Sequence, residues 1–333
     1  MSSEKKSQAL GLDVGTSRLV VAQRVDQEFH YETQLNAFVT IPHSRLTEGV
    51  LRKENIPHTV EDGEIVVHGN EAARFADLLG VETRRPMLNG VLNPNEPEGL
   101  SLMRQIVLAL AGESKKEGRK VCFSIPAPPL GYSANLTYHE ATLRQLLNEL
   151  GYEARSINEG LAVIYGELES SNYTGIGVSC GGGLCNVCLA YMSVPVLSFS
   201  VPKGGDFVDA SAASVTGELA NRIRISKEDT FHFNGHYADK LHQVLSVYYE
   251  DMILSIVNGL NDALSTSKNV PKLGRDLPLV LSGGSTLPPG FRDRFEKILR
   301  QADLPIKISE VRMAGDPLYS TAKGALVSAL IDM

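Results

Sequence analysis

Three glycine-rich segments each follow a short apolar run, and the first of them has residues that could bind phosphate and a metal ion. Gly15 and its small neighbours Thr16 and Ser17 allow a sharp turn whose backbone N–H groups converge on one phosphate. Asp13, at the end of the apolar run, is placed to hold Mg²⁺ through water, as this ion prefers. A motif this short is equally typical of an ordinary hairpin with a capping aspartate.

The second segment consists of three consecutive glycines, Gly181, Gly182 and Gly183, between apolar runs. Each glycine destabilises a regular element by roughly 0.5–1 kcal/mol relative to alanine, so the run indicates that another group approaches the bare backbone. We expect that group to be a second phosphate.

The third segment, residues 281–286 (LSGGST), lies after a predicted strand and before a predicted helix. Gly283 and Gly284 would allow a flat ring to lie against the backbone. Ser285 could either cap the helix or bond to the ring. The segment is therefore a candidate for binding a planar ligand.

The elements that must position these segments alternate along the chain. Apolar or β-branched runs predict strands at residues 9–14, 19–23, 120–125, 174–178, 186–192 and 277–281. Helical spacing predicts helices at residues 100–111, 138–150 and 238–264, the last interrupted near Gly259. This alternation predicts an α/β architecture with mostly parallel sheets. Because each half opens with a hairpin that contains a glycine turn, we predict two related halves around a central cleft.

The chain length and net charge limit the kinds of protein to which this sequence can belong. A chain of 333 residues suggests about two domains, and its net charge of −7 argues against a nucleic-acid backbone as the main partner. No apolar run approaches the roughly 20 residues of a transmembrane helix, and residues 1–8 are too polar for a secretory leader. We therefore expect a cytoplasmic protein.

Two other groups of residues are interpreted as structural and not as parts of a binding site. Cys180, Cys185 and Cys188 have part of the spacing of an iron–sulfur site, but the one other cysteine lies upstream, so core packing is expected. Residues 227–229 (KED) are expected to form a solvated edge.

Together with two further segments, the three glycine sites resemble the nucleotide signature of the actin, Hsp70 and sugar-kinase superfamily. Residues 159–166 (EGLAVIYG) are similar to its first connecting helix, and residues 316–325 to its second. The chain length and residues 69–72 and 87–92 resemble bacterial actins of the MreB/MamK type. The resemblance extends over nearly the whole chain.

The resemblance implies an actin-like fold, in which two RNase H-like α/β domains enclose a central nucleotide cleft and each has a smaller subdomain. Domain I would comprise residues 1–155 plus 315–333, with its small subdomain at roughly 32–84. Domain II would comprise residues 156–314, with its small subdomain at roughly 206–270.

The resemblance also implies a ligand, ATP or ADP with Mg²⁺, held by the three segments described above. The family's Gly-Gly-Asp motif adds Gly204, Gly205 and Asp206. Glu228 lies roughly where relatives contact the ribose or base, and Glu159 matches the residue that positions the attacking water.

Departures from the family pattern bear on catalysis. Ser179 stands where the family has an aspartate, Leu184 where it has a threonine, and Asn186 where it has an acid. Losing one preorganised contact typically lowers the rate by about 10²–10³. We therefore expect slow hydrolysis or none, unless a nearby acidic residue substitutes.

The function implied by the resemblance is that of a bacterial cytoskeletal protein, which binds ATP between its domains and polymerises with copies of itself. The sequence identifies no particular accessory protein as a further partner. One alternative is a non-polymerising nucleotide-binding scaffold, similar to relatives in pilus assembly or division anchoring. A third class, a small-molecule kinase, is disfavoured by Ser179, because phosphoryl transfer needs a carboxylate near the acceptor hydroxyl.

Overall fold

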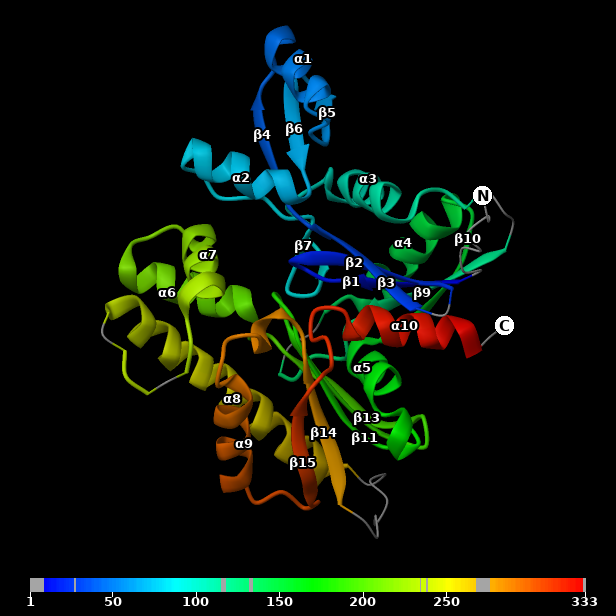
Figure 1. Ribbon diagram of the computed structural model, residues 1–333, viewed down its shortest axis with the longest axis vertical. Coiled ribbons are helices and arrows are strands. Elements are labelled where there is room, and N and C mark those ends of the chain that lie inside the picture. Colours follow the sequence, from blue (N-terminus) through cyan, green and yellow to red (C-terminus); the bar gives the residue numbers. More distant parts are fainter. Residues whose placement is uncertain are drawn as a thin grey trace.

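Two five-stranded sheets lie in the two halves of the chain, in a computed structural model that describes residues 9–26, 28–114, 118–131, 134–233, 235–237, 239–267 and 276–331 (Figure 1). The polar segment 1–8 and position 238, where the third predicted helix begins, lie outside the described residues.

The first sheet has the strand order β10-β9-β1-β2-β3. Its strands are β1 (Ala9–Val14), β2 (Arg18–Val25), β3 (Glu28–Leu35), β9 (Arg119–Ile125) and β10 (Tyr152–Asn158). β1, β2 and β3 form an antiparallel meander, whereas β9 runs parallel to β1 and β10 parallel to β9.

The second sheet repeats this topology strand for strand, in the order β13-β12-β11-β14-β15. Its strands are β11 (Gly175–Cys180), β12 (Cys185–Tyr191), β13 (Val194–Val201), β14 (Leu277–Ser282) and β15 (Ile308–Met313). The first three are again an antiparallel meander, and β14 and β15 again add in parallel. The predicted duplication of an α/β half is therefore confirmed. The expectation of mostly parallel sheets is wrong, because the three-stranded meander of each main sheet pairs antiparallel.

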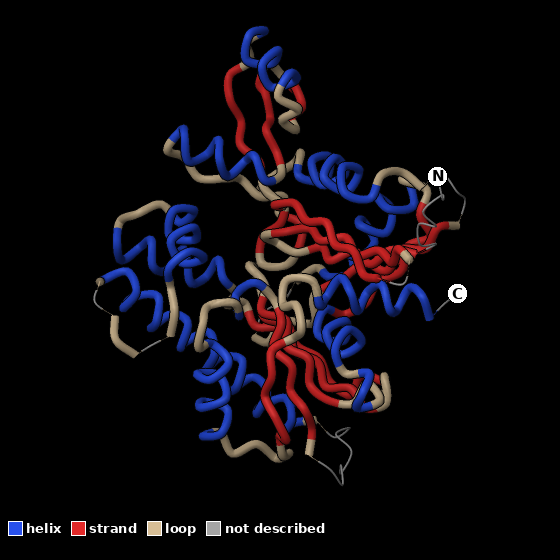
Figure 2. Tube along the Cα trace, in the orientation of Figure 1, coloured by secondary structure: helices blue, strands red, loops and turns tan. Residues whose placement is uncertain are grey.

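Helices α5 (Glu159–Glu167) and α10 (Ser320–Ile331) pack against each other between the two sheets (Figure 1). A Cβ at Gly324 would lie 1.7 Å from the Ala162 carbonyl oxygen, so glycine permits this close crossing. Figure 2 shows loops gathered where the two sheets meet.

Each half has additional elements outside its main sheet. On the first half they are β4 (Phe38–Pro42), α1 (Arg45–Lys53), β5 (His58–Glu61), β6 (Glu64–His68), α2 (Asn70–Leu79), β7 (Met87–Leu88), β8 (Val91–Leu92), α3 (Gly99–Ala111) and α4 (Leu136–Glu149). On the second they are α6 (Gly205–Thr216), α7 (Ala220–Thr230), α8 (Lys240–Thr266) and α9 (Phe291–Gln301). Short 3₁₀ turns occur at η1 (Glu169–Ser171) and η2 (Gly284–Thr286).

Helix α8 continues through Gly259, so the predicted interruption there is wrong. A Cβ at Gly259 would lie 2.9 Å from side-chain atoms of Leu130 and Phe199. The glycine therefore serves close packing within an unbroken helix.

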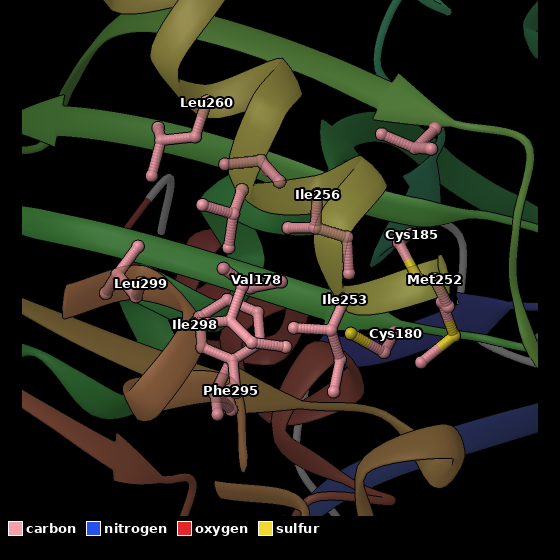
Figure 3. Packing of buried hydrophobic residues seen from close by; sticks show 14 of the residues in the cluster. Val178, Cys180, Cys185, Met252, Ile253, Ile256, Leu260, Phe295, Ile298 and Leu299 are labelled. Atoms are coloured by element: carbon pink, nitrogen blue, oxygen red, sulfur yellow. The ribbon is translucent and has the colours of Figure 1, made fainter. Parts of the chain in front are cut away.

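The core of the second half joins the β11–β12 hairpin to α8 (Figure 3). Cys180 and Cys185 are fully buried and belong to the same cluster as Met252, Ile253 and Ile256. Cys188 is buried on the side of the sheet that faces α5. Core packing of the three cysteines is therefore confirmed.

Candidate functional site

A cavity of about 260 Å³ lies between the two halves, close to the lower end of the roughly 300–1,000 Å³ typical of small-molecule sites. It is lined by nearly every residue that the sequence singled out. These are Asp13, Gly15, Thr16, Ser17, Glu159, Ser179, Gly181, Gly182, Gly183, Leu184, Gly205, Asp206, Glu228, Gly283, Gly284 and Ser285.

Gly204 is the predicted binding residue outside this lining. A Cβ at Gly204 would lie 2.2 Å from the Gly182 carbonyl oxygen, so glycine lets the start of α6 approach the second hairpin. The approach is fixed by hydrogen bonds from Gly205 N to Gly181 O (3.0 Å) and from Asp206 N to Gly182 O (2.9 Å).

The first hairpin, between β1 and β2, presents backbone donors to the cavity. Gly15 N donates to Arg18 O (3.0 Å), which closes the turn. Within the described part of the chain, the N–H groups of Thr16 and Ser17 have no hydrogen-bond partner. The Thr16 hydroxyl accepts a hydrogen bond from Gly90 N (3.0 Å), which holds the turn against the β7–β8 hairpin.

The second hairpin, between β11 and β12, lies against the first. A Cβ at Gly183 would lie 2.4 Å from Thr16 Oγ1, and one at Gly182 would lie 2.8 Å from Ser17 Cβ. Contact between the hairpins thus requires glycine at positions 182 and 183, a reason that the sequence did not indicate. The N–H groups of Gly182 and Gly183 also lack partners among the described residues.

Residues with unpaired N–H groups from both hairpins therefore line one cavity, and such N–H groups are the donors that an anionic phosphate group requires. One glycine of the cavity wall has a single close neighbour on its Cβ side. A Cβ at Gly284 would contact only Leu318 Cδ2, at 3.3 Å. These features fit a phosphate-bearing ligand with a nonpolar portion.

Asp13 is positioned by the neighbouring strand. Ser124 Oγ on β9 donates to Asp13 Oδ1 (2.7 Å) and accepts from Val14 N (2.9 Å). Burial raises the pKa of Asp13 to about 6, although the Ser124 hydrogen bond opposes this rise. A bound cation would remove this penalty, and Asp13 is accordingly the residue suited to hold Mg²⁺ through water.

Glu159 begins α5 and points at the same region. Its Oε2 accepts from Ser179 Oγ (3.2 Å) and from Asn186 Nδ2 (2.9 Å). Burial, and next the charge of Asp13, raise the pKa of Glu159 to about 8, while both hydrogen bonds lower it. Neutral donors therefore occupy two positions where the family resemblance predicts acids.

Asn186 also ties this carboxylate to the first half of the molecule. Fully buried, it accepts a hydrogen bond at Oδ1 from Ala127 N (2.8 Å), in the segment that follows β9. The same segment continues along β13, where Ser200 Oγ donates to Ala127 O (2.9 Å). Asn186 therefore fixes Glu159 relative to both halves.

The expectation that residues 227–229 form a solvated edge is wrong for Lys227. Its side chain is 6% exposed and its Nζ lies 2.7 Å from Asp209 Oδ1 on α6. Burial raises the pKa of Asp209 to about 6, against the lowering effect of Lys227. Packing of α7 on α6 thus turns the lysine inward, toward the cavity wall.

Helix α7 contributes two site residues that the sequence did not reveal. Arg224 and Lys227 line the cavity beside Glu228, and Arg224 Nη1 lies 3.3 Å from Glu228 Oε1. Their spacing of three and four residues, which places side chains on one helix face, was the available signal.

The third segment forms the opposite wall. Gly283 has φ +95° and a Cβ there would lie 2.2 Å from Cys180 O, so the position requires glycine. Ser285 Oγ donates to Gly181 O (2.9 Å), which links this segment to the second hairpin. It does not cap α9, because that helix begins only at Phe291 after Gly290.

Solved structures with the same fold include three bacterial proteins. A MamK double helical filament matches with a TM-score of 0.72 and 19% identity over 97% of this chain and 98% of that chain. MreB5 of Spiroplasma citri bound to ADP matches with a TM-score of 0.67 and 14% identity over 97% and 96%. Ethanolamine utilization protein EutJ from Carboxydothermus hydrogenoformans matches with a TM-score of 0.56 and 17% identity over 98% and 91%.

These similarities confirm the actin-like fold, with its two mixed α/β sheets. No curated protein sequence matches the chain. None of the helices in the described ranges has the length and apolarity that a membrane span requires. Residues 8–329 match a family model described as Volactin.

Proposed function

Since the chain belongs to the Volactin family and has an actin-like fold, we propose that it binds ATP with Mg²⁺ between its halves and assembles into filaments of identical subunits. The observation that carries the proposal is that residues with unpaired N–H groups, from both hairpins, line one cavity together with Asp13. Nucleotide bound there would contact both halves at once.

Each part of the cavity has a role in this proposal. Thr16, Ser17, Gly182 and Gly183 would donate backbone N–H groups to phosphate oxygens. Asp13 would hold Mg²⁺ through water, and the ion would supply neutralisation of phosphate charge when bound. The nucleoside would lie between α7 and the third segment, beside the open space at Gly284.

Hydrolysis would be slow in this arrangement. Glu159 would orient water, but its neighbours Ser179 and Asn186 offer it only neutral hydrogen-bond donors. Two other carboxylates that line the cavity are engaged in ion pairs, Asp206 with Arg85 at 2.6 Å and Asp209 with Lys227 at 2.7 Å. Filaments would therefore turn over slowly.

Assembly would follow from closure of the cleft. A ligand that contacts both halves stabilises the closed subunit through its differential affinity for that state. A head-to-tail contact between identical subunits then generates an open polymer. The similarity to a MamK double helical filament supports this proposal at the level of the fold.

High-speed sedimentation with and without Mg-ATP, with negative-stain electron microscopy of the pellet, tests the proposal. We expect ordered filaments that require nucleotide, and Asp13→Ala should remain in the supernatant. Protein that stays soluble in every salt and nucleotide condition would contradict the filament function. Binding of Mg-ATP by such soluble protein, measured by calorimetry, would instead identify a nucleotide-binding scaffold.

A further inference from the structure

The segment that follows α2 crosses from the first half of the chain to the second, where it contacts the start of α7. Glu82 Oε1 accepts a hydrogen bond from Ala220 N (2.6 Å), and Oε2 accepts one from Asn221 N (3.2 Å). Both partners belong to the second half of the chain, 138 and 139 residues further on. In Figure 1 the end of α2 lies directly above α7.

Helix α7 has no cap of its own. Leu219 occupies the N-cap position and its side chain accepts no hydrogen bond from the first turn. A helix leaves its first N–H groups without intrahelical partners, and a carboxylate there is favoured by both hydrogen bonding and the helix dipole. Glu82 therefore supplies, from the other half, the cap that the local sequence lacks.

Two neighbouring contacts reinforce the same junction. Asn221 Nδ2 donates to Val81 O (3.1 Å), and Arg222 Nε lies 3.5 Å from Asp77 Oδ1. The junction thus consists of an end of α2 and its following loop on one side, and the first turn of α7 on the other.

A third contact lies closer to the cavity. Arg85 Nη1 lies 2.6 Å from Asp206 Oδ1, in the first turn of α6. Asp206 lines the cavity and its backbone N–H bonds to Gly182 O. The crossing segment therefore reaches both of the helices that form the α6–α7 wall.

We propose that Glu82 is a positioning residue that latches α7 across the cleft and slows release of the nucleotide. Helix α7, whose first turn is held by Glu82, has Arg224, Lys227 and Glu228 in the cavity wall one to two turns later. In this proposal, separation of α7 from the first half precedes release of the nucleotide. The inference rests on the proposed nucleotide site, but the latch itself exists without ligand.

Glu82→Ala tests the latch by stopped-flow release of a fluorescent ATP analogue. Removal of a helix-capping side chain typically changes the equilibrium constant for helix formation about five- to tenfold. We therefore expect Glu82→Ala to release the ATP analogue faster by about that factor. Glu64→Ala, which removes another exposed carboxylate of the same half, should leave the rate unchanged.

A second variant separates a latch from a mere helix cap. Leu219 has extended backbone angles, φ −72° and ψ 140°, which suit an aspartate cap. Glu82→Ala combined with Leu219→Asp should regain thermal stability because α7 is capped locally, yet release should remain fast. Return of the slow release rate in this double variant would overturn the latch and leave Glu82 as a cap only.

A ligand-free measurement distinguishes failure of the latch from failure of the nucleotide site. Leu78 and Val215 are exposed on opposite sides of the junction, whereas the four native cysteines are buried, so Leu78→Cys and Val215→Cys accept spin labels selectively. We expect Glu82→Ala to broaden the electron–electron distance distribution toward longer values. An unchanged distribution would overturn the latch even if nucleotide binds, and absence of nucleotide binding would overturn only the proposed site.

Discussion

Ser179 donates a hydrogen bond to the carboxylate of Glu159, with 3.2 Å between Oγ and Oε2. The family resemblance predicts a carboxylate at position 179, where it would organise Mg²⁺ and the attacking water. In this chain the hydroxyl instead helps Asn186 to hold Glu159 in place. Under the proposed function, the site would therefore keep one acid to orient water, Glu159, and lack its partner.

Introducing the missing carboxylate should accelerate hydrolysis. We expect Ser179→Asp to raise the rate of phosphate release from Mg-ATP by at least tenfold, because one preorganised catalytic contact is typically worth about 10²–10³ in rate. Ser179→Ala is the matched control and should not exceed the wild-type rate. Equal rates for the aspartate variant and the wild type would contradict the assignment of position 179.

The raised pKa of Glu159 predicts a pH-dependent stability in ligand-free protein. With a pKa of about 8 in the folded state, against 4.5 normally, this carboxyl keeps a proton that the unfolded chain releases. Its presence therefore lowers the free energy of unfolding as pH rises from about 4.5 to 8.

Glu159→Gln removes this titration and should be more stable than the wild type at pH 8, by on the order of 4 kcal/mol, with a much smaller difference at pH 5. Urea unfolding across this pH range is the measurement. Glu218→Gln, at an exposed carboxylate, should show no such trend. A constant difference between Glu159→Gln and wild type at all pH values would exclude the linkage.

Local patterns in the sequence were sufficient for six of the strands, the two glycine hairpins and the presence of two related halves, but not for the remaining strands or their order in the sheets. Alternation of apolar runs with glycine turns is a property of neighbouring residues, and it locates Asp13 and the glycine run at strand ends. Residues from all three segments, together with Glu159, do line one cavity.

Features that depend on contacts between distant residues could not be predicted in this way. Lys227 turns inward only because α7 packs on α6, where Asp209 faces it. Gly259 serves the packing of α8 against Phe199, and its local sequence looks like a helix break. The cap that Glu82 supplies to α7 joins residues with no shared local pattern.

Contact between the hairpins makes Gly183 intolerant of a side chain. A Cβ there would lie 2.4 Å from Thr16 Oγ1 and 2.9 Å from Gly90 N. We expect Gly183→Ala to lower the free energy of unfolding by about 1–3 kcal/mol, as overpacking typically does. Gly49→Ala, at an exposed helical site with no atom within 4 Å of the new Cβ, should not destabilise the protein.

Gly284 offers the opposite case, a glycine whose side of the cavity is open. Gly284→Ala should leave the melting temperature nearly unchanged, since only Leu318 lies near the new methyl group. Affinity for Mg-ATP should nevertheless fall about tenfold or more, because the methyl occupies ligand space. Calorimetry provides the comparison, and unchanged affinity would show that the ligand does not use this wall.

The buried pair of Lys227 and Asp209 should show strong coupling. Removing one partner of such a pair typically destabilises by about 3–5 kcal/mol, because the remaining charge is buried without compensation. Lys227→Met should therefore lower the free energy of unfolding by several times more than an exposed lysine substitution would. Adding Asp209→Leu to that variant should restore much of the loss.

The loss caused by Lys227→Met should also depend on pH. Burial already raises the pKa of Asp209 to about 6 with the lysine present, and removing the lysine raises it further. At pH 5 the Asp209 carboxyl of the variant then takes up a proton and is neutral in the folded state. At pH 8 the folded state must either bury an unpaired charge or bind a proton from a dilute solution, and both lower the free energy of unfolding. Urea unfolding should accordingly show a smaller loss at pH 5 than at pH 8, and equal losses would mean that Asp209 finds another cation in the variant.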